Sequence, residues 1–236
     1  MSNRVYSNLK LGGYTTTKEG ICAFQKAYGL EETGELNEAT TKLLSLKRCG
    51  MPDSGFTLNN VRIDFYRGQR GGQSSRIRVR GGVVTFGFGR RTRDVGRRKQ
   101  RRAIKRAFKT WGAVLPFRFK KVPVRRATIR VSFVKKRHGD RYPFDGRGGT
   151  LAHAFFPCTS SPFCSDVHFD DGERWGLEAT RRKIDIQTVA LHEIGHSLGL
   201  GHSNVAAAVM YAFYQGKRRA LNPDDISRVR AIYGSS

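Results

Sequence analysis

The apolar positions near the N-terminus predict a short amphipathic helix. In residues 18–30, Ile21, Phe24 and Tyr28 recur with the spacing i, i+3, i+7, which places all three on one helical face. Gly29 follows as a residue that can end the helix. We therefore expect this helix to bury one face against neighbouring segments.

A second helix follows in the same region. Asn37 precedes the segment EATTKLL and is a candidate N-cap for it. Two short helices indicate a small all-α domain over residues 1–53. Residues 54–75 are rich in Gly, Asn, Gln and Ser and are interpreted as a linker to a second domain.

From residue 76 onward, alternating and helical segments are mixed. A strand or hairpin comes first, followed by a helix, two short alternating strands, a glycine-rich segment with three histidines, and two more helices. This order indicates an α+β domain over residues 76–236, with most of its sheet ahead of the last two helices. The segments cover residues 77–89, 94–114, 117–122, 127–134, 138–175, 185–198 and 224–234.

The first helix of this domain is predicted to be strongly basic. Ile104, Phe108 and Trp111 form one apolar stripe at i, i+4, i+7, whereas Lys and Arg dominate the other positions. Asp94 is a candidate cap for the helix.

The basic helix belongs to a segment that carries almost the whole net charge of +25. Residues 61–137 hold 26 Lys and Arg but only two acids, Asp64 and Asp94, which leaves 18 basic and 17 acidic residues for the rest. Such a segment attracts polyanions, whether sulfated glycan, nucleic acid or an anionic surface. The alternative is a solvated surface that happens to use arginine.

Four cysteines are too few for a disulfide scaffold. Cys158 and Cys164 enclose a five-residue loop that a local disulfide would close, and such a bond favours an oxidising compartment. The alternative is two free thiols. Cys22 lies in an apolar helical pattern, where we expect it to be buried.

Neither a membrane span nor a signal peptide is expected within this sequence. No stretch approaches the roughly 18 apolar residues of a spanning helix. The first twenty residues lack both the apolar core and the small-residue cleavage site of a signal peptide. Either a leader precedes these residues, or the protein leaves the cell by another route, or it stays inside.

The strongest chemical signal is the motif LHEIGHSLGLGHS. His192 and His196 are four residues apart on a predicted helix, Gly199 can end that helix, and His202 can return to the same point. Three neutral imidazoles with an open fourth position suit a catalytic zinc. Glu193 is then placed to accept a proton from a water that attacks a carbonyl group.

The other three histidines form a second set. His138, His153 and His168, together with Asp140, supply four ligands in a glycine-rich segment, which is typical of a closed structural zinc site. All six histidines of the chain therefore fall into two metal constellations. For any one of them alone, an ordinary loop or core histidine would be the simpler interpretation.

Oxygen donors suitable for calcium lie beside this second set. Two loops supply carboxylates and backbone carbonyls, which are the ligands that calcium prefers. Solvated turn acids are the alternative. The candidate residues are Asp145, Gly146, Gly148, Thr150, Asp170 and Glu173.

These motifs, in this order, resemble the matrix metalloproteinases of the metzincin class over about residues 20–234. The segments that carry the resemblance are HGDRYPFDGRGGTLAHAF, DVHFDDGERW, TVALHEIGHSLGLGHS and DDISRVRAIYG, with FQKAYGLEETGELNEATTKLL resembling a peptidoglycan-binding-like propeptide. Met210 in AAVMY looks like the Met-turn beneath the zinc.

The resemblance implies a twisted mixed sheet with three helices, two zinc ions and at least one calcium ion. It also implies a secreted, latent and monomeric endopeptidase that acts on extracellular-matrix-type proteins. Without a hemopexin-like domain, the chain resembles the minimal members of the family. The favoured interpretation of the oxygen donors as a calcium site depends mainly on this resemblance.

The segment LKRCGMPD looks like the cysteine switch of that family. A thiolate is a good zinc ligand, so Cys49 is expected to fill the open position and keep the enzyme latent. Arg48 and Asp53 carry opposite charges and are expected to pair across the turn. The alternative is an incidental surface thiol.

Several positions depart from the family pattern. Lys47 stands where proline is usual, and Ala212-Phe213-Tyr214 replaces the Pro-x-Tyr wall of the substrate pocket. Residues 158–164 replace a glycine-rich calcium loop, which speaks against a second calcium at Asp166. The RRTR run at 90–93 is interpreted as surface charge rather than a processing site.

The basic segment leaves one alternative function open. The chain would then be a polyanion-binding protein in which the protease site is secondary or vestigial. The intact Glu193 and three intact histidines argue against a vestigial site.

Overall fold

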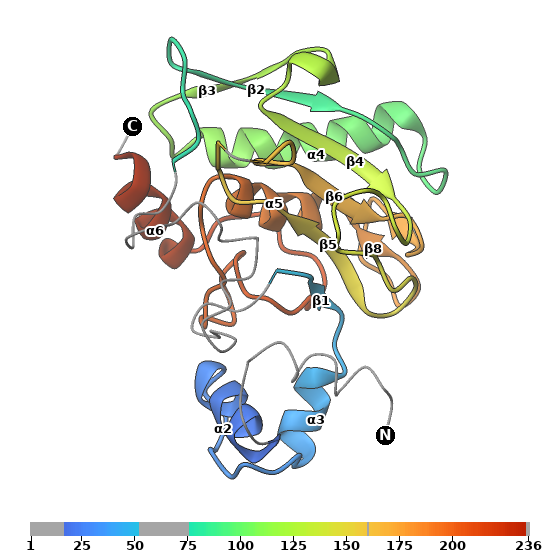
Figure 1. The fold of residues 1–236 in the computed structure, drawn as a ribbon, viewed down its shortest axis with the longest axis vertical. Coiled ribbons are helices and arrows are strands. Elements are labelled where there is room, and N and C mark those ends of the chain that lie inside the picture. Colours follow the sequence, from blue (N-terminus) through green and yellow to red (C-terminus); the bar gives the residue numbers. More distant parts are fainter. Residues whose placement is uncertain (1–16, 52–75, 160, 235–236) are drawn as a thin grey trace.

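The computed structural model describes residues 17–51, 76–159 and 161–234 of the 236-residue chain (Figure 1). The predicted linker over residues 54–75 and the proposed acid partner of Arg48, Asp53, lie outside the described residues. Within those residues, no helix combines the length and apolar character that a membrane crossing requires.

The described part of the N-terminal region holds two helices, α2 (Thr17–Ala27) and α3 (Glu38–Leu44). Gly29 follows α2 with a φ of 65°, and the Asn37 side chain accepts a hydrogen bond from the Thr40 amide at the start of α3, as predicted. Phe24 is buried, but Cys22 is only half-buried, so its predicted burial is partly wrong.

The main sheet has six strands in the order β1-β5-β6-β4-β2-β3. Only the β5–β6 pair is antiparallel, so the sheet is mixed. The first strand, β1, comes from the N-terminal region and extends the edge of the sheet beside β5 (Figure 1). The strands are β1 (Arg48–Cys49), β2 (Val83–Phe88), β3 (Arg118–Lys121), β4 (Ile129–Val134), β5 (Thr150–Ala154) and β6 (Val167–Asp170), with a separate parallel pair β7 (Trp175–Gly176) and β8 (Ile184–Asp185).

Three helices complete this part of the molecule: α4 (Arg97–Gly112), α5 (Ile186–Ser197) and α6 (Pro223–Tyr233), with a short 3-10 turn, η3 (Val124–Arg126). Helices α4 and α5 pack against each other and against the sheet, and every residue of α5 is buried (Figure 1). The indole of Trp111 in α4 donates a hydrogen bond to the Leu191 carbonyl of α5 at 2.8 Å. The predicted α+β fold with a mixed sheet and three helices is thus confirmed.

The structure corrects two local expectations. Helix α4 begins after Gly96 without a side-chain cap, and Asp94 instead accepts a hydrogen bond from the Trp175 amide at 2.8 Å. Asp94 lies too far ahead of the first helical turn to cap it. Strands β5 and β6 lie inside the glycine-rich segment, where the sequence predicted no strand. Each strand is short and largely buried, so neither shows the alternation of apolar and polar residues that would have revealed it.

Close packing of α5 makes Gly195 a sensitive position. A Cβ atom there would lie 2.3 Å from Met210 Sδ and 3.0 Å from Trp111 Cζ2. We predict that Gly195→Ala destabilises the chain by about 1–3 kcal/mol through overpacking, seen as a fall in Tm of several degrees. Gly112→Ala is the matched control, since its Cβ would make an ordinary contact of 3.5 Å with Phe119. An unchanged Tm for Gly195→Ala would contradict this packing.

Candidate active site and metal centres

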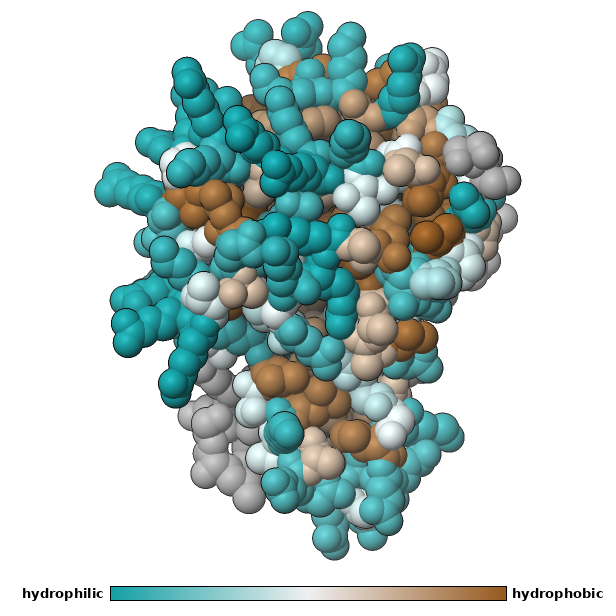
Figure 2. Space-filling view, turned by 180° about the vertical axis from the view of Figure 1, so that it is seen from behind, coloured by the Kyte–Doolittle hydropathy of each residue, from teal (hydrophilic) through white to brown (hydrophobic). Residues whose placement is uncertain are grey.

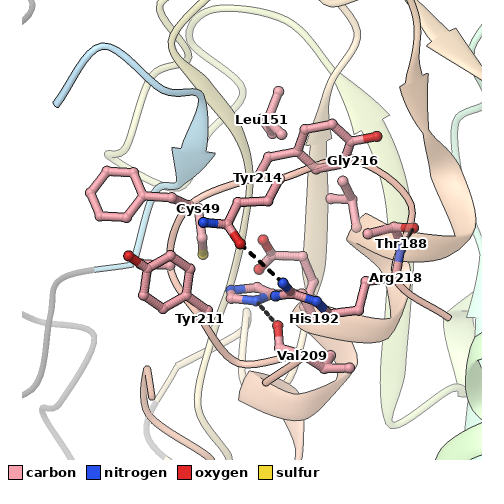
Figure 3. Close-up of a pocket in the computed structure, with 14 residues that line it drawn as sticks. Cys49, Leu151, Thr188, His192, Val209, Tyr211, Tyr214, Gly216 and Arg218 are labelled. Atoms are coloured by element: carbon pink, nitrogen blue, oxygen red, sulfur yellow. Dashed lines mark hydrogen bonds between the residues drawn. The ribbon is translucent and has the colours of Figure 1, made fainter. Parts of the chain in front are cut away.

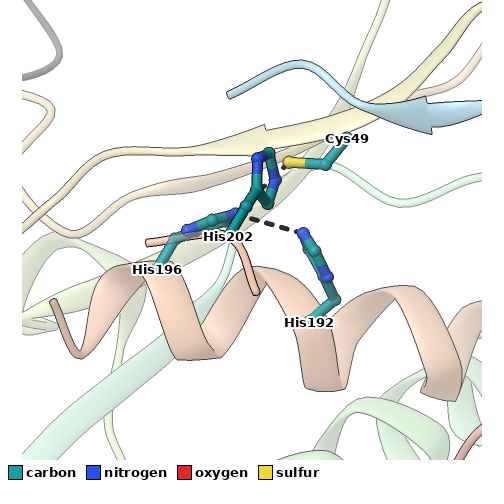
Figure 4. A group of neighbouring side chains, drawn as sticks. All are labelled: Cys49, His192, His196 and His202. Atoms are coloured by element: carbon teal, nitrogen blue, oxygen red, sulfur yellow. Dashed lines mark hydrogen bonds between the residues drawn. The ribbon is translucent and has the colours of Figure 1, made fainter. Parts of the chain in front are cut away.

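Helix α5 and the turn that follows it bring three histidines together. His192 and His196 lie one turn apart on α5, Gly199 ends the helix region with a φ of 97°, and the chain then returns His202 to the same point (Figure 4). Ligand atoms of these residues and Cys49 all lie within 4.8 Å of one another, and all four residues are buried.

The hydrogen bonds of the first two histidines set their tautomers. His192 Nδ1 lies 2.7 Å from the Val209 carbonyl oxygen, and His196 Nδ1 lies 2.7 Å from the Leu200 carbonyl oxygen. A carbonyl oxygen only accepts, so each Nδ1 carries the proton and each Nε2 presents a lone pair. Because these two Nε2 atoms lie 3.1 Å apart, a cation between them would relieve their repulsion.

Burial favours the same neutral, metal-binding form. It lowers the pKa of His192 to about 3, with a further contribution from the charge of His202. Burial also lowers the pKa of His196 well below its usual range. The donor set of three neutral imidazoles and one sulfur therefore fits zinc.

Glu193 lies beside this cluster, and one oxygen of its carboxylate makes no hydrogen bond to a described residue. It is 1% exposed, and its Oε2 atom has no hydrogen-bond partner among the described residues. Burial raises the pKa of Glu193 to about 8. A buried carboxylate with an unused oxygen is suited to accept a proton from a molecule bound next to it.

The turn under the cluster is held by an acid that the sequence did not single out. Met210 is fully buried, and its amide and that of Val209 donate hydrogen bonds to the Asp225 carboxylate at 3.0 and 2.8 Å. Asp225 belongs to α6 and is itself fully buried. The predicted Met-turn residue thus lies against α5 at Gly195, fixed from the C-terminal helix.

The structure places Cys49 at the open side of the three histidines. Its Sγ atom lies 3.4 Å from His196 Nε2 and accepts from the Met51 amide at 3.4 Å. Burial, followed by the charge of Glu193, raises the pKa of the Cys49 thiol well above its usual range. A thiolate at this position therefore requires a compensating cation.

Backbone pairing holds the cysteine segment in the cleft from both sides. Cys49 N donates to the Ala212 oxygen at 3.0 Å, and Gly50 N donates to the Ala152 oxygen of β5 at 2.8 Å. A Cβ atom on Gly50 would lie 2.6 Å from Thr150 Cγ2, so any side chain there would force Thr150 to move. The segment thus behaves as an added strand of the sheet.

A small cavity of about 40 Å³ lies next to His192 and Glu193 (Figure 3). Tyr214 forms part of its wall and donates its amide to the Lys47 oxygen at 2.8 Å. The Arg218 guanidinium also lines the cavity and donates to the Ala206 oxygen at 2.7 Å. The other lining residues are Cys49, Leu151, Thr188, Val189, Val209, Tyr211, Ala212, Phe213, Gln215 and Gly216.

Arg48 contacts this wall. Its guanidinium lies 5.0 Å from the centroid of the Phe213 ring, and its Nε donates to the Cys49 oxygen at 3.1 Å. Phe213 also packs against Phe24 of α2. The wall residues therefore join the cleft to the N-terminal helices.

The second histidine set also converges on one point. His138 Nε2, His153 Nε2 and His168 Nδ1 each lie 2.7 Å from Asp140 Oδ2. Burial acts to raise the pKa of Asp140, but hydrogen bonds from His153 and His168 outweigh it and hold the pKa well below its usual range. Four buried or half-buried ligands from separate loops and strands fit a structural zinc.

The oxygen donors lie near one another but do not form a cluster as tight as the two histidine sets. Asp170 accepts from the Gly146 and Gly172 amides, and Asp145 accepts from the Thr150 amide. Burial raises the pKa of Asp170, and the charges of Asp145 and Glu173 raise it further. Glu173 accepts from the Gly148 amide and forms a 2.6 Å ion pair with Lys47.

The Lys47–Glu173 pair is a contact that sequence reasoning missed. The Glu173 side chain is completely buried, whereas the Lys47 side chain is 31% exposed. The lysine that replaces the family's usual proline therefore joins the cysteine segment to the candidate calcium loop. The only sequence signal for this contact is that lysine replaces the usual proline at position 47.

Residues 158–166 differ in kind from a calcium loop. Cys158 and Cys164 are joined by a disulfide. Asp166 is buried and pairs with the Arg130 side chain at 2.8 Å. Burial raises the pKa of Asp166, and Arg130 partly offsets this effect. The Arg130 guanidinium thus compensates the charge of the buried Asp166 carboxylate.

Two family models match the chain. The matrixin model of peptidase family M10 covers residues 78–234, and a putative peptidoglycan-binding domain covers residues 14–44. Rat matrilysin is 36% identical over 224 residues, which span 93% of this chain and 78% of matrilysin.

Longer relatives match over the same part of the chain. The hatching enzyme of Paracentrotus lividus is 41% identical over 219 residues, and rat matrix metalloproteinase-16 is 37% identical over 234 residues. These matches cover 92% and 93% of this chain but only 34% and 37% of the two relatives, so the chain spans about a third of their length. The family match, together with the two histidine clusters and the cysteine in the cleft, shows that the chain belongs to the matrixin family of zinc metalloendopeptidases.

Proposed function

We propose that this chain is a latent zinc endopeptidase that hydrolyses peptide bonds of proteins and is kept inactive by Cys49. The observation that carries the proposal is the convergence of Cys49, His192, His196 and His202 beside the buried carboxylate of Glu193. Cys49 stands where a water or substrate oxygen would have to enter. Activation then requires only that this segment leaves the cleft.

The three histidines and Glu193 divide the work of the reaction. His192, His196 and His202 would hold a zinc ion, which when bound polarises a carbonyl and lowers the pKa of water at the site to about 7. Glu193 accepts the proton of the attacking water and passes it to the leaving amine. Glu193 is buried in the latent chain, and release of the cysteine segment would open the space beside it to the attacking water.

The edge of β5 is the proposed binding place for the substrate backbone. Strand β1 covers that edge in the latent chain through the Gly50–Ala152 hydrogen bond. Its removal would expose unpaired backbone groups that bind an extended peptide by strand addition. The cavity beside His192, bounded by Ala212-Phe213-Tyr214 and Arg218, would receive the side chain that follows the scissile bond.

The remaining metal sites are proposed to be structural. His138, Asp140, His153 and His168 would hold the second zinc. Calcium would bind between the two loops through the carboxylates of Asp145, Asp170 and Glu173, with backbone carbonyls of Gly146, Gly148 and Thr150 as further ligands. Burial raises the pKa of Asp170 and the charges of Asp145 and Glu173 add to this effect, so a cation between these carboxylates would be stabilising.

We also propose the division into a propeptide (1–53), a linker (54–75) and a catalytic domain (76–236). The family matches over 14–44 and 78–234 support it. An extracellular location is supported by the Cys158–Cys164 disulfide, since such bonds persist in oxidising compartments. Extracellular-matrix-type proteins are the proposed substrates, and we propose a monomer.

A second function is favoured by the charge distribution. Residues 61–137 hold 26 of the 44 Lys and Arg of the chain and two acids. We propose that this basic segment binds a polyanion and positions the protease on an acidic matrix or substrate. This binding accompanies the peptidase activity and does not replace it.

Glu193→Ala is predicted to abolish peptide hydrolysis while zinc remains bound, because the three histidine ligands are untouched. The full chain is incubated with zinc, calcium and a thiol-modifying reagent on a quenched generic peptide library, and bound zinc is measured in parallel. We expect thiol-triggered, chelator-sensitive cleavage in the unaltered chain. A loss of about 100-fold or more is expected for the variant.

Cys49→Ser is the matched test of latency. It is expected to cleave the library without the thiol reagent, since the hydroxyl is a far weaker zinc ligand than a thiolate. Near-normal activity of Glu193→Ala would contradict the catalytic role. A silent Cys49→Ser chain that still binds zinc would contradict the latency mechanism.

Lys47→Gln is predicted to speed the thiol-triggered activation. The substitution removes the cation paired with the buried Glu173 carboxylate and so weakens the hold on the cysteine segment. Since Lys47 is partly exposed, the expected gain in activation rate is only about threefold. Lys42→Gln, in the exposed part of α3, is the control and should leave the rate unchanged. Equal rates for both variants would show that the ion pair does not contribute to latency.

Calcium is predicted to raise the Tm of the latent chain by several degrees, because a ligand that binds only the folded state stabilises it by about 2.7 kcal/mol at 100 times its Kd. Asp170→Asn should lose most of this shift. Glu178→Gln, which alters an exposed carboxylate paired with Lys217, should keep it. A calcium-dependent shift of equal size in Asp170→Asn would place the ion elsewhere.

A further inference from the structure

Helix α4 presents an uncompensated row of cations. It holds eight Lys and Arg in sixteen residues and no acid. None of these eight side chains forms an ion pair with any residue in the described ranges. The cations are Arg97, Arg98, Lys99, Arg101, Arg102, Lys105, Arg106 and Lys109. All but Arg101 are exposed, and Arg101 is half-buried.

This charge opposes the stability of the helix. Pairs such as Arg97–Arg101, Arg98–Arg102 and Lys105–Lys109 stand four residues apart, where like charges destabilise a helix by about 0.2–0.5 kcal/mol each. Burial lowers the pKa of Arg101, and the charge of Arg97 lowers it further. The helix tolerates this repulsion because its other face, including Ile104 and Trp111, is completely buried.

A cavity of about 250 Å³ lies at the start of this row, between α4 and the end of β2. Three guanidinium-bearing residues line it: Arg91, Arg97 and Arg101. Gln100 also lines it and is 4% exposed, with an Oε1 atom that has no partner among the described residues. In the orientation observed this oxygen is an acceptor, and only the flipped amide, with its NH2 group in the place of the oxygen, would donate to an anion.

The remaining features of the cavity also favour an anion. The Arg101 guanidinium lies 5.3 Å from the centroid of the Phe88 ring, which orients its planar fork. Gly96 at the N-cap supplies no side-chain hydrogen bond to α4, and the positive end of the helix dipole lies at this end of the row. We name Arg91, Arg97, Gln100 and Arg101 the anion pocket.

We propose that the anion pocket binds a sulfate group of a sulfated glycan, and that the rest of the α4 row follows the same glycan chain. The proposal rests on, and sharpens, the polyanion binding proposed above. Guanidinium groups match the oxygens of a sulfate in a bidentate manner, which ammonium groups do not.

Three observations favour a sulfated glycan over other polyanions. The only large hydrophobic residues exposed in the described part of the chain are Val79 and Val205, so this part offers no apolar wedge for a membrane. Phe88 lines the pocket but is half-buried with the Arg101 guanidinium over its ring, which disfavours stacking of a nucleic-acid base there. The Cys158–Cys164 disulfide supports the extracellular location proposed above, where sulfated glycans are abundant polyanions.

The anion pocket is accessible in the latent chain. The N-terminal helices α2 and α3 lie at the opposite end of the molecule from α4 (Figure 1). Seen from behind, long hydrophilic side chains project from the upper left, the side on which α4 begins (Figure 2). Glycan binding at the anion pocket therefore does not require release of the cysteine segment.

The test uses the full latent chain and a heparin-derived hexasaccharide, with affinity measured by calorimetry at several salt concentrations. Arg97→Gln with Arg101→Gln should weaken binding about tenfold or more and reduce the salt dependence. Arg97→Lys with Arg101→Lys keeps the charge but removes the paired N–H donors of the two guanidinium groups, so it should weaken binding about threefold. Arg181→Gln with Arg182→Gln removes the same charge from an exposed turn and should change the affinity less than twofold.

Thermal unfolding shows whether each variant is folded, and hexasaccharide should raise the Tm of the unaltered chain but not of the Arg97/Arg101 glutamine variant. Equal losses in the α4 and control variants would overturn the pocket while leaving general polyanion binding in place. Absence of hexasaccharide binding to the unaltered chain at low salt would overturn both. Equally tight binding of duplex DNA or anionic phosphatidylserine vesicles at the same salt would overturn the assignment to a sulfated glycan.

Discussion

The contact between the Cys49 sulfur and the three-histidine cluster determines the arrangement of the latent molecule. To place that sulfur 3.4 Å from His196, the chain must enter the cleft as a strand between β5 and the wall at 212–214. The same entry makes β1 the sixth strand of the sheet. It also leaves so little room at residue 50 that any side chain there would force Thr150 to move.

Three kinds of interaction around this contact keep the cysteine segment in the cleft. Backbone pairing with β5 is the most local, and the aromatic contacts of Phe213 with Arg48 and Phe24 extend it to α2. The ion pair of Lys47 with Glu173 connects it to the loop proposed to bind calcium. Release of the propeptide therefore has to break backbone, apolar and ionic contacts together, although only the sulfur blocks the zinc position.

The sequence predicted the parts of the site that depend on local spacing. His192 and His196 share a face because helical geometry places residues four apart together, and the glycine at 199 predicted the return to His202. Contacts between distant segments could not be read in this way. Asp225 holds the Met210 turn, and Lys47 meets Glu173, only because the tertiary fold brings separate elements together. Asp94 shows the reverse case, since a plausible helix cap is used by the Trp175 amide instead.

Whether Cys49 is a zinc ligand in the latent chain can be measured directly by X-ray absorption at the zinc edge. With both proposed zinc sites filled, we expect an average of one sulfur ligand for every two zinc ions, at about 2.3 Å. That sulfur signal should disappear in Cys49→Ser, with the nitrogen and oxygen ligands retained. A latent, zinc-loaded chain without any sulfur ligand would show that Cys49 does not bind the zinc.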